Sequence, residues 1–306
     1  MPPQRVEVEI EGHRLSLSNL DKVLYPAAGF TKGQVIDYYT RIAPAVLPHL
    51  RGRALTLKRY PNGVDAKYFY EKQCPSHAPD WVRTAPIYSA SNGRTIDFCL
   101  AEDVPTLVWL ANLADLELHT SLALATDDRA PNLLAFDLDP GAPATIVECA
   151  EVALELRAAL DHFGLAGFPK TSGSKGMQVY VPLNPPSDYQ QTSGFARGVA
   201  QVLERTHPEL VVSGMSRELR KGRVFVDWSQ NSRHKTTVCV YSLRAQPRPT
   251  VSTPLRWEEV EAVTESRDPD DLVFDSEAVL ERVSEHGDLY APVVSLRQSL
   301  PSGLAA

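Results

Sequence analysis

Two carboxylates separated by a single leucine are the residues best suited to chemistry. Asp137 and Asp139 end the apolar run 133–136, and Pro140 stops it. A short apolar run closed by Pro-Gly is more typical of a buried strand than of a helix. Residues i and i+2 of a strand share a face, so the carboxylates repel each other unless a cation lies between them. The pattern indicates a hard divalent metal with oxygen ligands; a strand-ending turn capped by Asp139 is the alternative.

A third carboxylate closes a second apolar run. Asp227 follows residues 224–226, and the basic residues Arg233 and Lys235 come soon after it. Three strand-end carboxylates beside a phosphate-binding loop describe a two-metal phosphoryl-transfer site. One metal would activate the attacking hydroxyl, and the other would neutralise charge on the phosphates.

Residues 171–176 (TSGSKG) could form such a loop. The segment combines small residues, hydroxyls, backbone N–H groups and a lysine within one turn, as phosphate binding requires. It lacks the spacing of a Walker A loop, and a strand pattern follows it rather than a helix. A solvated hairpin turn is the alternative interpretation.

The elements that position these residues alternate between strands and helices. Strand patterns occupy residues 5–17, 54–58, 116–119, 133–139, 178–183, 224–228 and 236–242, and a hairpin is expected over 87–100 around Ser91. Capping boxes at Thr31 and Thr145 open two amphipathic helices, and Pro44 and Pro48 should kink or break the far end of the first. The 306 residues suggest one domain, or two lobes around a cleft with the N-terminal lobe covering about 1–130.

The overall composition is that of an ordinary globular protein. No run approaches eighteen apolar residues and the N-terminus has no apolar leader, so we expect a cytoplasmic protein without a membrane segment. The cysteines are far apart and form no CxxC pair, which predicts reduced thiols and no structural zinc. They are Cys74, Cys99, Cys149 and Cys239.

The charge distribution favours a polyanionic substrate more than the total does. The net charge of −7 argues against a general nucleic-acid binder, but basic residues concentrate in 51–59 and 217–235. Phe69 and Tyr70 form an aromatic pair beside the first basic stretch. Such a pair could stack on bases or belong to the core.

The order of these motifs resembles the archaeo-eukaryotic primase superfamily and, more narrowly, the polymerase domain of bacterial ligase D. The matching stretches cover nearly the whole chain and are residues 20–26, 58–63, 69–73, 136–141, 171–176, 225–231, 235–237 and 241–244. The resemblance implies an α+β, primase-like catalytic core with a central antiparallel or mixed β-sheet flanked by helices, formed by residues 1–306 as one catalytic domain.

The resemblance also implies a function. It points to a metal-dependent, DNA-templated nucleotidyltransferase that uses Mn²⁺ or Mg²⁺ and often favours ribonucleotides. The implied substrates are NTP or dNTP and a gapped or broken DNA duplex with a 5′-phosphate, in end joining or gap filling. A nucleoid-associated, stand-alone polymerase is expected, because no ligase or nuclease domain is recognised, with Ku and a separate ligase as partners.

Site residues are carried over by position. The implied metal ligands are Asp137, Asp139 and Asp227. The implied nucleotide-binding residues are Ser172, Ser174, Lys175, His119, Gln230, Arg244, Arg59 and Phe69 or Tyr70. Those for a DNA 5′-phosphate are Asn19, Lys22 and Lys32, and Lys32 opens a helix whose free N–H groups favour an anion.

Two departures from the family pattern stand out. Gln178 occupies the position of a usual histidine, and it can donate a hydrogen bond but carries no positive charge. The segments 87–100 and 119–132 are shorter than usual. Two alternatives remain: a DxD glycosyltransferase, which leaves Asp227 unexplained, and a catalytically decayed protein that binds DNA ends.

Overall fold

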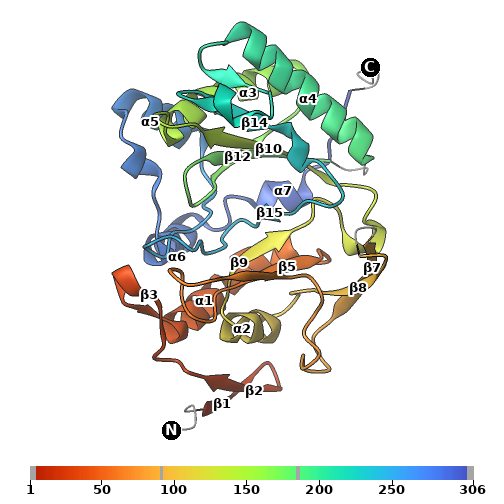
Figure 1. The fold of residues 1–306 in the computed structure, drawn as a ribbon, viewed down its shortest axis with the longest axis vertical. Coiled ribbons are helices and arrows are strands. Elements are labelled where there is room, and N and C mark those ends of the chain that lie inside the picture. The colour runs from red at the N-terminus through yellow and green to blue at the C-terminus, as the bar shows by residue number, and fades with distance from the viewer. Residues whose placement is uncertain (1–4, 90–91, 184–186, 302–306) are drawn as a thin grey trace. The chain divides into compact units, whose positions relative to one another are not determined.

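The computed structural model describes residues 5–89, 92–183 and 187–301 (Figure 1). The chain forms two compact units. Unit 1 comprises residues 1–120, 238–251 and 275–288, and unit 2 comprises 121–237, 252–274 and 289–306. Each larger sheet has helices packed around it, so the predicted mixed α+β class is confirmed. None of the described helices is both long and apolar enough to cross a membrane.

Unit 1 is built on a four-stranded sheet with the strand order β15-β9-β5-β6, in which β5 pairs antiparallel with both β6 and β9. Its strands are β5 (Leu55–Arg59), β6 (Phe69–Glu71), β9 (Asp115–Thr120) and β15 (Thr237–Val238). Three hairpins accompany it: β1 (Arg5–Ile10) with β2 (His13–Ser18), β3 (Val23–Tyr25) with β4 (Phe30–Thr31), and β7 (Thr84–Ser89) with β8 (Arg94–Cys99). The predicted hairpin thus begins earlier than expected, and its turn residue Ser91 lies outside the described residues.

The helices of unit 1 are α1 (Lys32–Leu50), α2 (Val104–Asn112) and α6 (Ser276–His286). The predicted capping box of α1 is present, with Thr31 Oγ1 accepting from Gln34 N. Pro44 and Pro48 do not break this helix, because α1 continues through both to Leu50, and the predicted alternative of a kink stays a prediction. Proline fits helical φ, and burial of the apolar face of α1 offsets the backbone hydrogen bonds that it removes.

Two further expectations for the fold were wrong. Cys74 and Cys99 form a disulfide with a Cα–Cα distance of 5.1 Å, because Cys74 N bonds to Asp97 O and so holds the loop after β6 against β8. Sequence separation alone therefore does not keep thiols apart. Cys149 and Cys239 are buried and form no disulfide with the described residues. The strand expected over 236–242 is only two residues long, since the chain turns at Tyr241, where φ is +64°.

Unit 2 is built on a five-stranded sheet in the order β11-β12-β10-β14-β13. Its strands are β10 (Leu133–Pro140), β11 (Phe168–Thr171), β12 (Met177–Pro182), β13 (Val211–Val212) and β14 (Val224–Asp227). All neighbours are antiparallel except β13 and β14. The helices are α3 (Ile146–His162), which opens with the predicted capping box, α4 (Tyr189–Thr206), α5 (Trp257–Ser266) and α7 (Ala291–Ser295).

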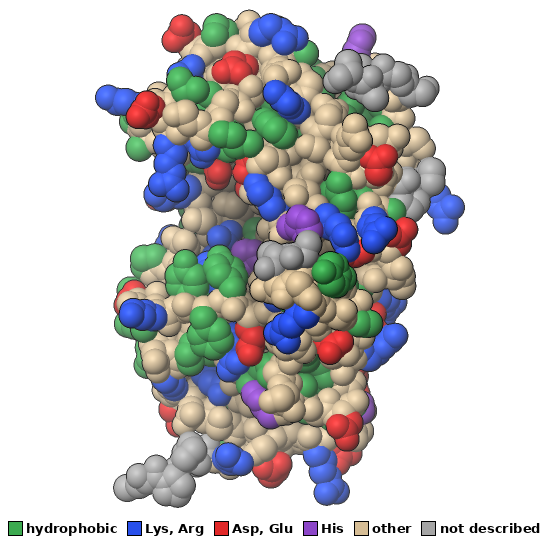
Figure 2. All heavy atoms as spheres, turned by 45° about the vertical axis from the view of Figure 1, so that its right-hand side comes forward, with side chains coloured by type: hydrophobic (Ala, Val, Ile, Leu, Met, Phe, Trp, Pro, Cys, Tyr) green, Lys and Arg blue, Asp and Glu red, His purple; other side chains and the backbone are tan. Residues whose placement is uncertain are grey.

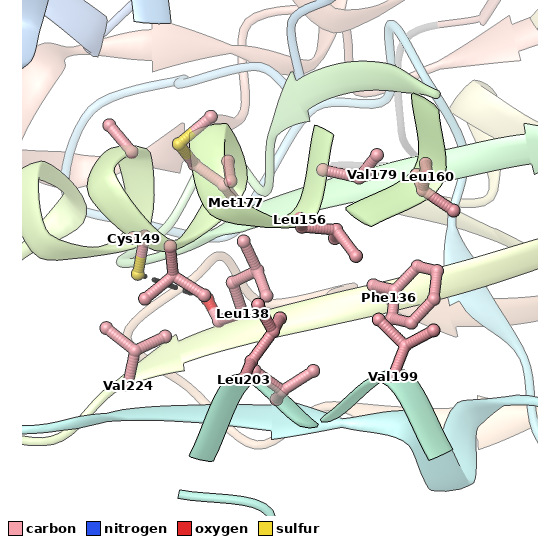
Figure 3. Close-up of a cluster of buried hydrophobic side chains, with 14 of the residues drawn as sticks. Phe136, Leu138, Cys149, Leu156, Leu160, Met177, Val179, Val199, Leu203 and Val224 are labelled. Atoms are coloured by element: carbon pink, nitrogen blue, oxygen red, sulfur yellow. Dashed lines mark hydrogen bonds between the residues drawn. The ribbon is translucent and has the colours of Figure 1, made fainter. Parts of the chain in front are cut away.

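One face of this sheet forms the core of unit 2. Phe136 and Leu138 of β10 pack with Met177 and Val179 of β12 against side chains of α3 and α4 (Figure 3). Cys149 of α3 donates a hydrogen bond to the Leu138 carbonyl at 3.4 Å. Because side chains alternate along a strand, the residues between these apolar ones face the opposite side of the sheet. The candidate site lies on that opposite face.

Candidate active site

A row of four polar side chains crosses the unit 2 sheet. Lys170 of β11 lies opposite Gln178 of β12, Gln178 lies opposite Asp137 of β10, and Asp137 lies opposite Asp227 of β14. Directly opposed residues in antiparallel strands have Cβ atoms about 4.5–5.5 Å apart. Strand register therefore places three segments far apart in sequence into one continuous line of side chains.

Asp137 lies at the centre of this row. Its Oδ1 accepts a hydrogen bond from Gln178 Nε2 at 3.0 Å, and its Oδ2 accepts one from Gln230 Nε2 at 3.4 Å. Burial, together with the negative charge of Asp139, raises the pKa of Asp137 to about 7. The raised pKa indicates that the charge of Asp137 lacks sufficient compensation from the protein.

Asp227 is held by the segment that follows it. Its Oδ1 accepts from Ser229 N at 3.0 Å and from Ser229 Oγ at 2.5 Å, and its Oδ2 accepts from Gln230 Nε2 at 3.0 Å. Asp139 lies at the end of β10 and its side chain reaches the surface. Neighbouring atoms still exclude part of the water around its carboxylate, and this loss of hydration, followed by the charge of Asp227, raises the pKa of Asp139. Asn231 extends the ladder by bonding to both the N–H and the C=O of Ala135.

These carboxylates fit a divalent cation. Gln230 Nε2 donates to one oxygen each of Asp137 and Asp227, so a single donor position lies between the two side chains. Carboxylate oxygens are the ligands that Mg²⁺ and Mn²⁺ prefer. Within the described residues, no three His, Cys, Asp or Glu side chains already converge as a complete metal-binding group, so the convergent part of the site is the Asp137–Asp227 pair.

Lys170 is a functional candidate that the sequence did not reveal. Its side chain is fully buried, and its Nζ donates to Gln178 Oε1 at 2.7 Å and to Ser252 Oγ at 2.6 Å. An ammonium group can only donate, so it fixes the carbonyl of Gln178 toward itself and the amide N–H toward Asp137. Gln178 thus has a defined donor role despite its lack of charge.

The predicted phosphate loop is a closed turn between β11 and β12. Ser172 Oγ accepts from Ser174 N and from Gly176 N, each at 3.2 Å. A side chain at Gly176 would place its Cβ 2.1 Å from the Leu138 carbonyl, so the loop lies directly against β10. Lys175 is exposed and makes no hydrogen bond or ion pair with the described residues.

A second polar cluster lies on the unit 1 sheet around Glu117. This buried carboxylate accepts from Lys58 Nζ at 2.9 Å and from His119 Nε2 at 3.0 Å, and Arg244 Nε lies 3.5 Å away. Burial alone would raise the pKa of Glu117, but the His119 hydrogen bond and the charges of Arg244 and Lys58 hold it well below its usual range. The structure thus brings the predicted residues His119 and Arg244 together through one carboxylate.

Exposed aromatic rings border this cluster. Tyr70 lies opposite Lys58 in the sheet, and its ring centroid is 6.3 Å from that of His119. Lys58 Nζ lies 4.7 Å from the centroid of Tyr68, which is 49% exposed. A cation beside accessible rings suits a nucleotide, whose phosphates and base need both.

Arg59 and Phe69 lie on the other face of the same strands. Arg59 pairs with Glu71 at 2.7 Å, and its guanidinium lies 5.2 Å from the centre of the Phe69 ring. The sequence prediction left Phe69 and Tyr70 as alternatives. The structure separates them: Tyr70 belongs to the Glu117 cluster, and Phe69 belongs with Arg59.

Two of the three residues predicted to bind a 5′-phosphate, Asn19 and Lys22, line a cavity in unit 1, and Lys32 is not among its described lining residues. The volume of the cavity is about 600 Å³, and its lining includes Asn19, Asp21 and Lys22. Lys32 is buried, and its Nζ donates to the Ser18 carbonyl at 2.6 Å. Burial, and then the charges of Lys22 and Arg59, lower the pKa of Lys32 to about 8.

The expectation of free N–H groups at the start of α1 was wrong. Lys32 N donates to the Lys22 carbonyl, Gly33 N donates to the Leu20 carbonyl, and Gln34 N donates to Thr31 Oγ1. The loop before the helix satisfies these donors, so an anion at this cavity depends on side chains.

On the face that Figure 2 shows, Lys and Arg side chains are spread among acidic ones. In unit 2, Arg233 is paired with Asp128 at 2.7 Å, whereas Lys235 donates to Ser229 Oγ at 2.5 Å and lies 4.0 Å from Asp227. Basic residues therefore act at individual positions beside the carboxylates.

Sequence reasoning missed several members of these clusters. Glu117 precedes His119 by two residues in a strand pattern, so alternation alone could have placed both on one face. The others were not assigned to the site, although Lys58, Ser229 and Lys235 lie within the stretches that the sequence analysis singled out, whereas Lys170 bonds to Ser252, which is 82 residues away. These others are Lys58, Tyr68, Lys170, Ser229 and Lys235.

Comparison with known proteins identifies the family. The model of the LigD primase-polymerase domain matches residues 31–290. The chain is 43% identical over 282 residues to the multifunctional non-homologous end joining protein LigD of Mycolicibacterium smegmatis, covering 92% of this chain but 36% of that protein. It is 33% identical over 275 residues to the bifunctional LigD of Bacillus subtilis, covering 90% of this chain and 43% of that protein.

A solved structure agrees over the whole domain. The polymerase domain of Mycobacterium tuberculosis ligase D in complex with DNA is 40% identical and superposes with a TM-score of 0.86, covering 93% of this chain and 99% of that one. The chain spans little more than a third of the length of the mycobacterial relatives that it matches. It belongs to the LigD primase-polymerase domain family, which consists of metal-dependent nucleotidyltransferases.

Proposed function

We propose that this chain is a DNA-templated polymerase that adds nucleotides at gaps or breaks in duplex DNA during end joining. The observation that carries the proposal is the Asp137–Asp227 pair, which faces away from the core and shares the Gln230 donor. A DxD glycosyltransferase would not need a third carboxylate on a separate strand. Family membership gives the reaction class, and the Asp137–Asp227 pair would bind the metal that this reaction requires.

The unit 2 residues would hold the metals and the triphosphate. Asp137, Asp139 and Asp227 would bind Mn²⁺ or Mg²⁺, which supplies charge neutralisation and acidifies the attacking hydroxyl. Exposed Lys175 would contact the phosphates as a charge-assisted donor. Ser172 and Ser174 would also bind the triphosphate, and the hydrogen bond from Ser174 N to Ser172 Oγ keeps the loop closed.

The unit 1 residues would bind the nucleotide and the template. His119 and Arg244, held by Glu117, would contact the anionic part of the nucleotide, and Tyr70 would stack on a base. Phe69 with Arg59 would frame the template base from the other face of the strands. Residues 1–306 would together serve as one catalytic domain.

The DNA end would be recognised through its 5′-phosphate. Asn19 and Lys22 line the 600 Å³ cavity, and Lys32, whose amine donates to the Ser18 carbonyl, would add its charge. We also propose that the chain associates with Ku and a DNA ligase and acts at the nucleoid.

A primer-extension assay tests this function. Wild-type protein, a gapped duplex with a 5′-phosphate, Mn²⁺ and labelled nucleotides should give extension. Asp137→Asn and Asp227→Asn should each lower the rate by about a hundredfold to a thousandfold or more, with folding intact. Asp128→Asn is the matched control, because it removes a unit 2 carboxylate that pairs with Arg233 outside the row.

The rivals give different results. Near wild-type extension by folded Asp137→Asn would contradict the metal assignment. Transfer from a sugar nucleotide would favour the glycosyltransferase, and DNA binding without any extension by wild-type protein would favour the decayed end-binding protein.

A further inference from the structure

Two lysines flank the carboxylate row of unit 2, and each reaches a carboxylate through a neutral side chain. Lys170 begins the row on β11, and Lys235 follows η4 (Trp228–Gln230) beyond β14. Their settings differ, since Lys170 is fully buried and the Lys235 side chain is 42% exposed. The hydrogen-bond pattern at both ends is nevertheless the same.

At the first end, Lys170 Nζ donates to Gln178 Oε1 at 2.7 Å, and Gln178 Nε2 donates to Asp137 Oδ1 at 3.0 Å. The lysine has only donors, so the amide of Gln178 cannot reverse without placing its N–H₂ group against the ammonium. Lys170 therefore sets the direction in which Gln178 donates.

At the second end, Lys235 Nζ donates to Ser229 Oγ at 2.5 Å, and Ser229 Oγ donates to Asp227 Oδ1 at 2.5 Å. A hydroxyl has a single hydrogen, so a donor on its lone pair leaves that hydrogen directed at the carboxylate. Ser229 N adds a second bond to the same oxygen at 3.0 Å.

Both chains end on the Oδ1 atom of a carboxylate and leave the Oδ2 atoms to face a common point. Gln230 Nε2 lies 3.4 Å from Asp137 Oδ2 and 3.0 Å from Asp227 Oδ2. The Oδ1 atom of each side chain is thus held by a donor that a lysine orients, whereas the two Oδ2 atoms converge on the Gln230 amide that they share.

We propose that Lys170 and Lys235 are positioning residues that, through Gln178 and Ser229, select which oxygen of Asp137 and of Asp227 binds a shared divalent cation. The proposal rests on the metal-binding function proposed above. It assigns to the two lysines a role that depends on hydrogen-bond direction and not on their charge.

An orienting role and a purely electrostatic role of the two lysines predict opposite changes in Mn²⁺ affinity. If the lysines acted only as charges, replacing them would remove repulsion toward a cation and tighten Mn²⁺ binding. If they orient the carboxylates, Lys170→Met and Lys235→Met should each weaken Mn²⁺ binding by about tenfold, as loss of outer hydrogen-bond partners usually does. The measurement is the dissociation constant from the free-Mn²⁺ electron paramagnetic resonance signal, with full-length protein and no nucleotide.

Control variants separate the possible causes. Arg233→Met removes a cation two residues from Lys235 that pairs with Asp128, so it should leave Mn²⁺ affinity within about twofold of wild type. Lys235→Arg restores a donor and should recover most of the affinity. Because Lys235 is half-exposed, its variants should fold even where Lys170→Met does not.

A double-mutant cycle tests the route. Once Ser229→Ala has removed the intermediary, Lys235→Met should have little additional effect on Mn²⁺ affinity. An equal additional effect, or tighter or unchanged Mn²⁺ binding by folded Lys235→Met, would overturn the proposal. Asp227→Asn is the reference variant. If it leaves Mn²⁺ affinity unchanged, the metal site itself is wrong. If it weakens Mn²⁺ binding while the lysine variants bind Mn²⁺ as tightly as wild type, only the roles of the lysines are refuted.

Discussion

In unit 2 the polar cluster on the sheet gathers carboxylates, whereas in unit 1 the polar cluster gathers cations around one carboxylate. Asp137 faces Asp227, the neutral amide of Gln230 donates to both, and the pKa of Asp137 is raised to about 7. Glu117 is buried among Lys58, His119 and Arg244, and its pKa lies well below the usual range. The same sheet geometry therefore supports opposite charge balances.

The difference indicates what each cluster can bind. A surplus of carboxylate charge calls for a cation, and a surplus of cationic groups around one acid calls for an anion. A nucleoside triphosphate with its metal supplies both. The comparison can be tested by changing one charge at a time.

The largest stability effect should come from the balanced cluster. Glu117→Gln removes the carboxylate that neutralises Lys58 and Arg244, so we expect it to lower the free energy of unfolding by about 3–5 kcal/mol. Urea denaturation at pH 7 measures this. Glu71→Gln, which breaks the more exposed Arg59 pair, is the control and should cost about 1 kcal/mol or less. A loss below 1 kcal/mol for Glu117→Gln would show that the cluster is not internally balanced.

Nucleotide use should depend on the exposed lysine of the phosphate loop. Lys175→Ala removes a charge-assisted contact, so we expect KM for nucleotide to rise by about thirtyfold while DNA affinity stays within about twofold of wild type. Steady-state kinetics and DNA titration measure the two quantities. Lys221→Ala, at another exposed lysine of unit 2, should change neither. Equal effects on both quantities would instead place Lys175 on the DNA path.

The Asp137–Asp227 pair should make the free energy of unfolding depend on pH in the metal-free protein. Folded Asp137 titrates near pH 7 and the unfolded residue near its ordinary value of 3.8, so the folded state holds the extra proton between these values. Stability should therefore fall as pH rises from about 4 to about 7. Because water reaches part of Asp137, we expect Asp137→Asn to gain only about 1–2 kcal/mol over wild type at pH 8.

Chelator-treated samples unfolded with urea at several pH values give this measurement. The two proteins should be nearly equally stable at pH 4, where Asp137 is protonated in the folded state. Parallel curves for wild type and Asp137→Asn at all pH values would show that Asp137 is already compensated.

The smallest effect concerns the 5′-phosphate. At low salt, wild-type protein should bind a gapped duplex about fivefold more tightly with a 5′-phosphate than with a 5′-hydroxyl, and salt should reduce this preference. The preference should decline above pH 8, where Lys32 loses its proton, and Lys32→Arg should extend it to higher pH. The double change of Lys22 and Lys32 to alanine should abolish it, and persistence of the preference in that variant would exclude this cavity.

Local sequence patterns predicted those elements that depend on neighbouring residues. The capping boxes of α1 and α3 were confirmed because they depend on residues three positions apart. The three carboxylates were recognisable because each ends an apolar strand run.

Strand register and long-range partners could not be predicted in this way. Lys170 lies in a four-residue strand and bonds to Ser252, which is 82 residues away, so no local period marks it. Glu117 is neutralised partly by Arg244, from a different segment of unit 1. The Cys74–Cys99 pairing likewise depends on how β8 folds beside the loop after β6. Each of these contacts is decided by tertiary packing.

The alternation along β10 also has a consequence for how the chain avoids misfolding. A shift of one residue in the pairing of β10 would turn Asp137 and Asp139 toward α3 and α4 and would expose Phe136 and Leu138. Burying two carboxylates in that apolar core is strongly unfavourable, so the shifted pairing is rejected during folding. Asp137 and Asp139, which are proposed to bind metal, thus also disfavour the wrong register of β10. A chain without these two carboxylates would lose both the activity and this energetic penalty on the shifted pairing.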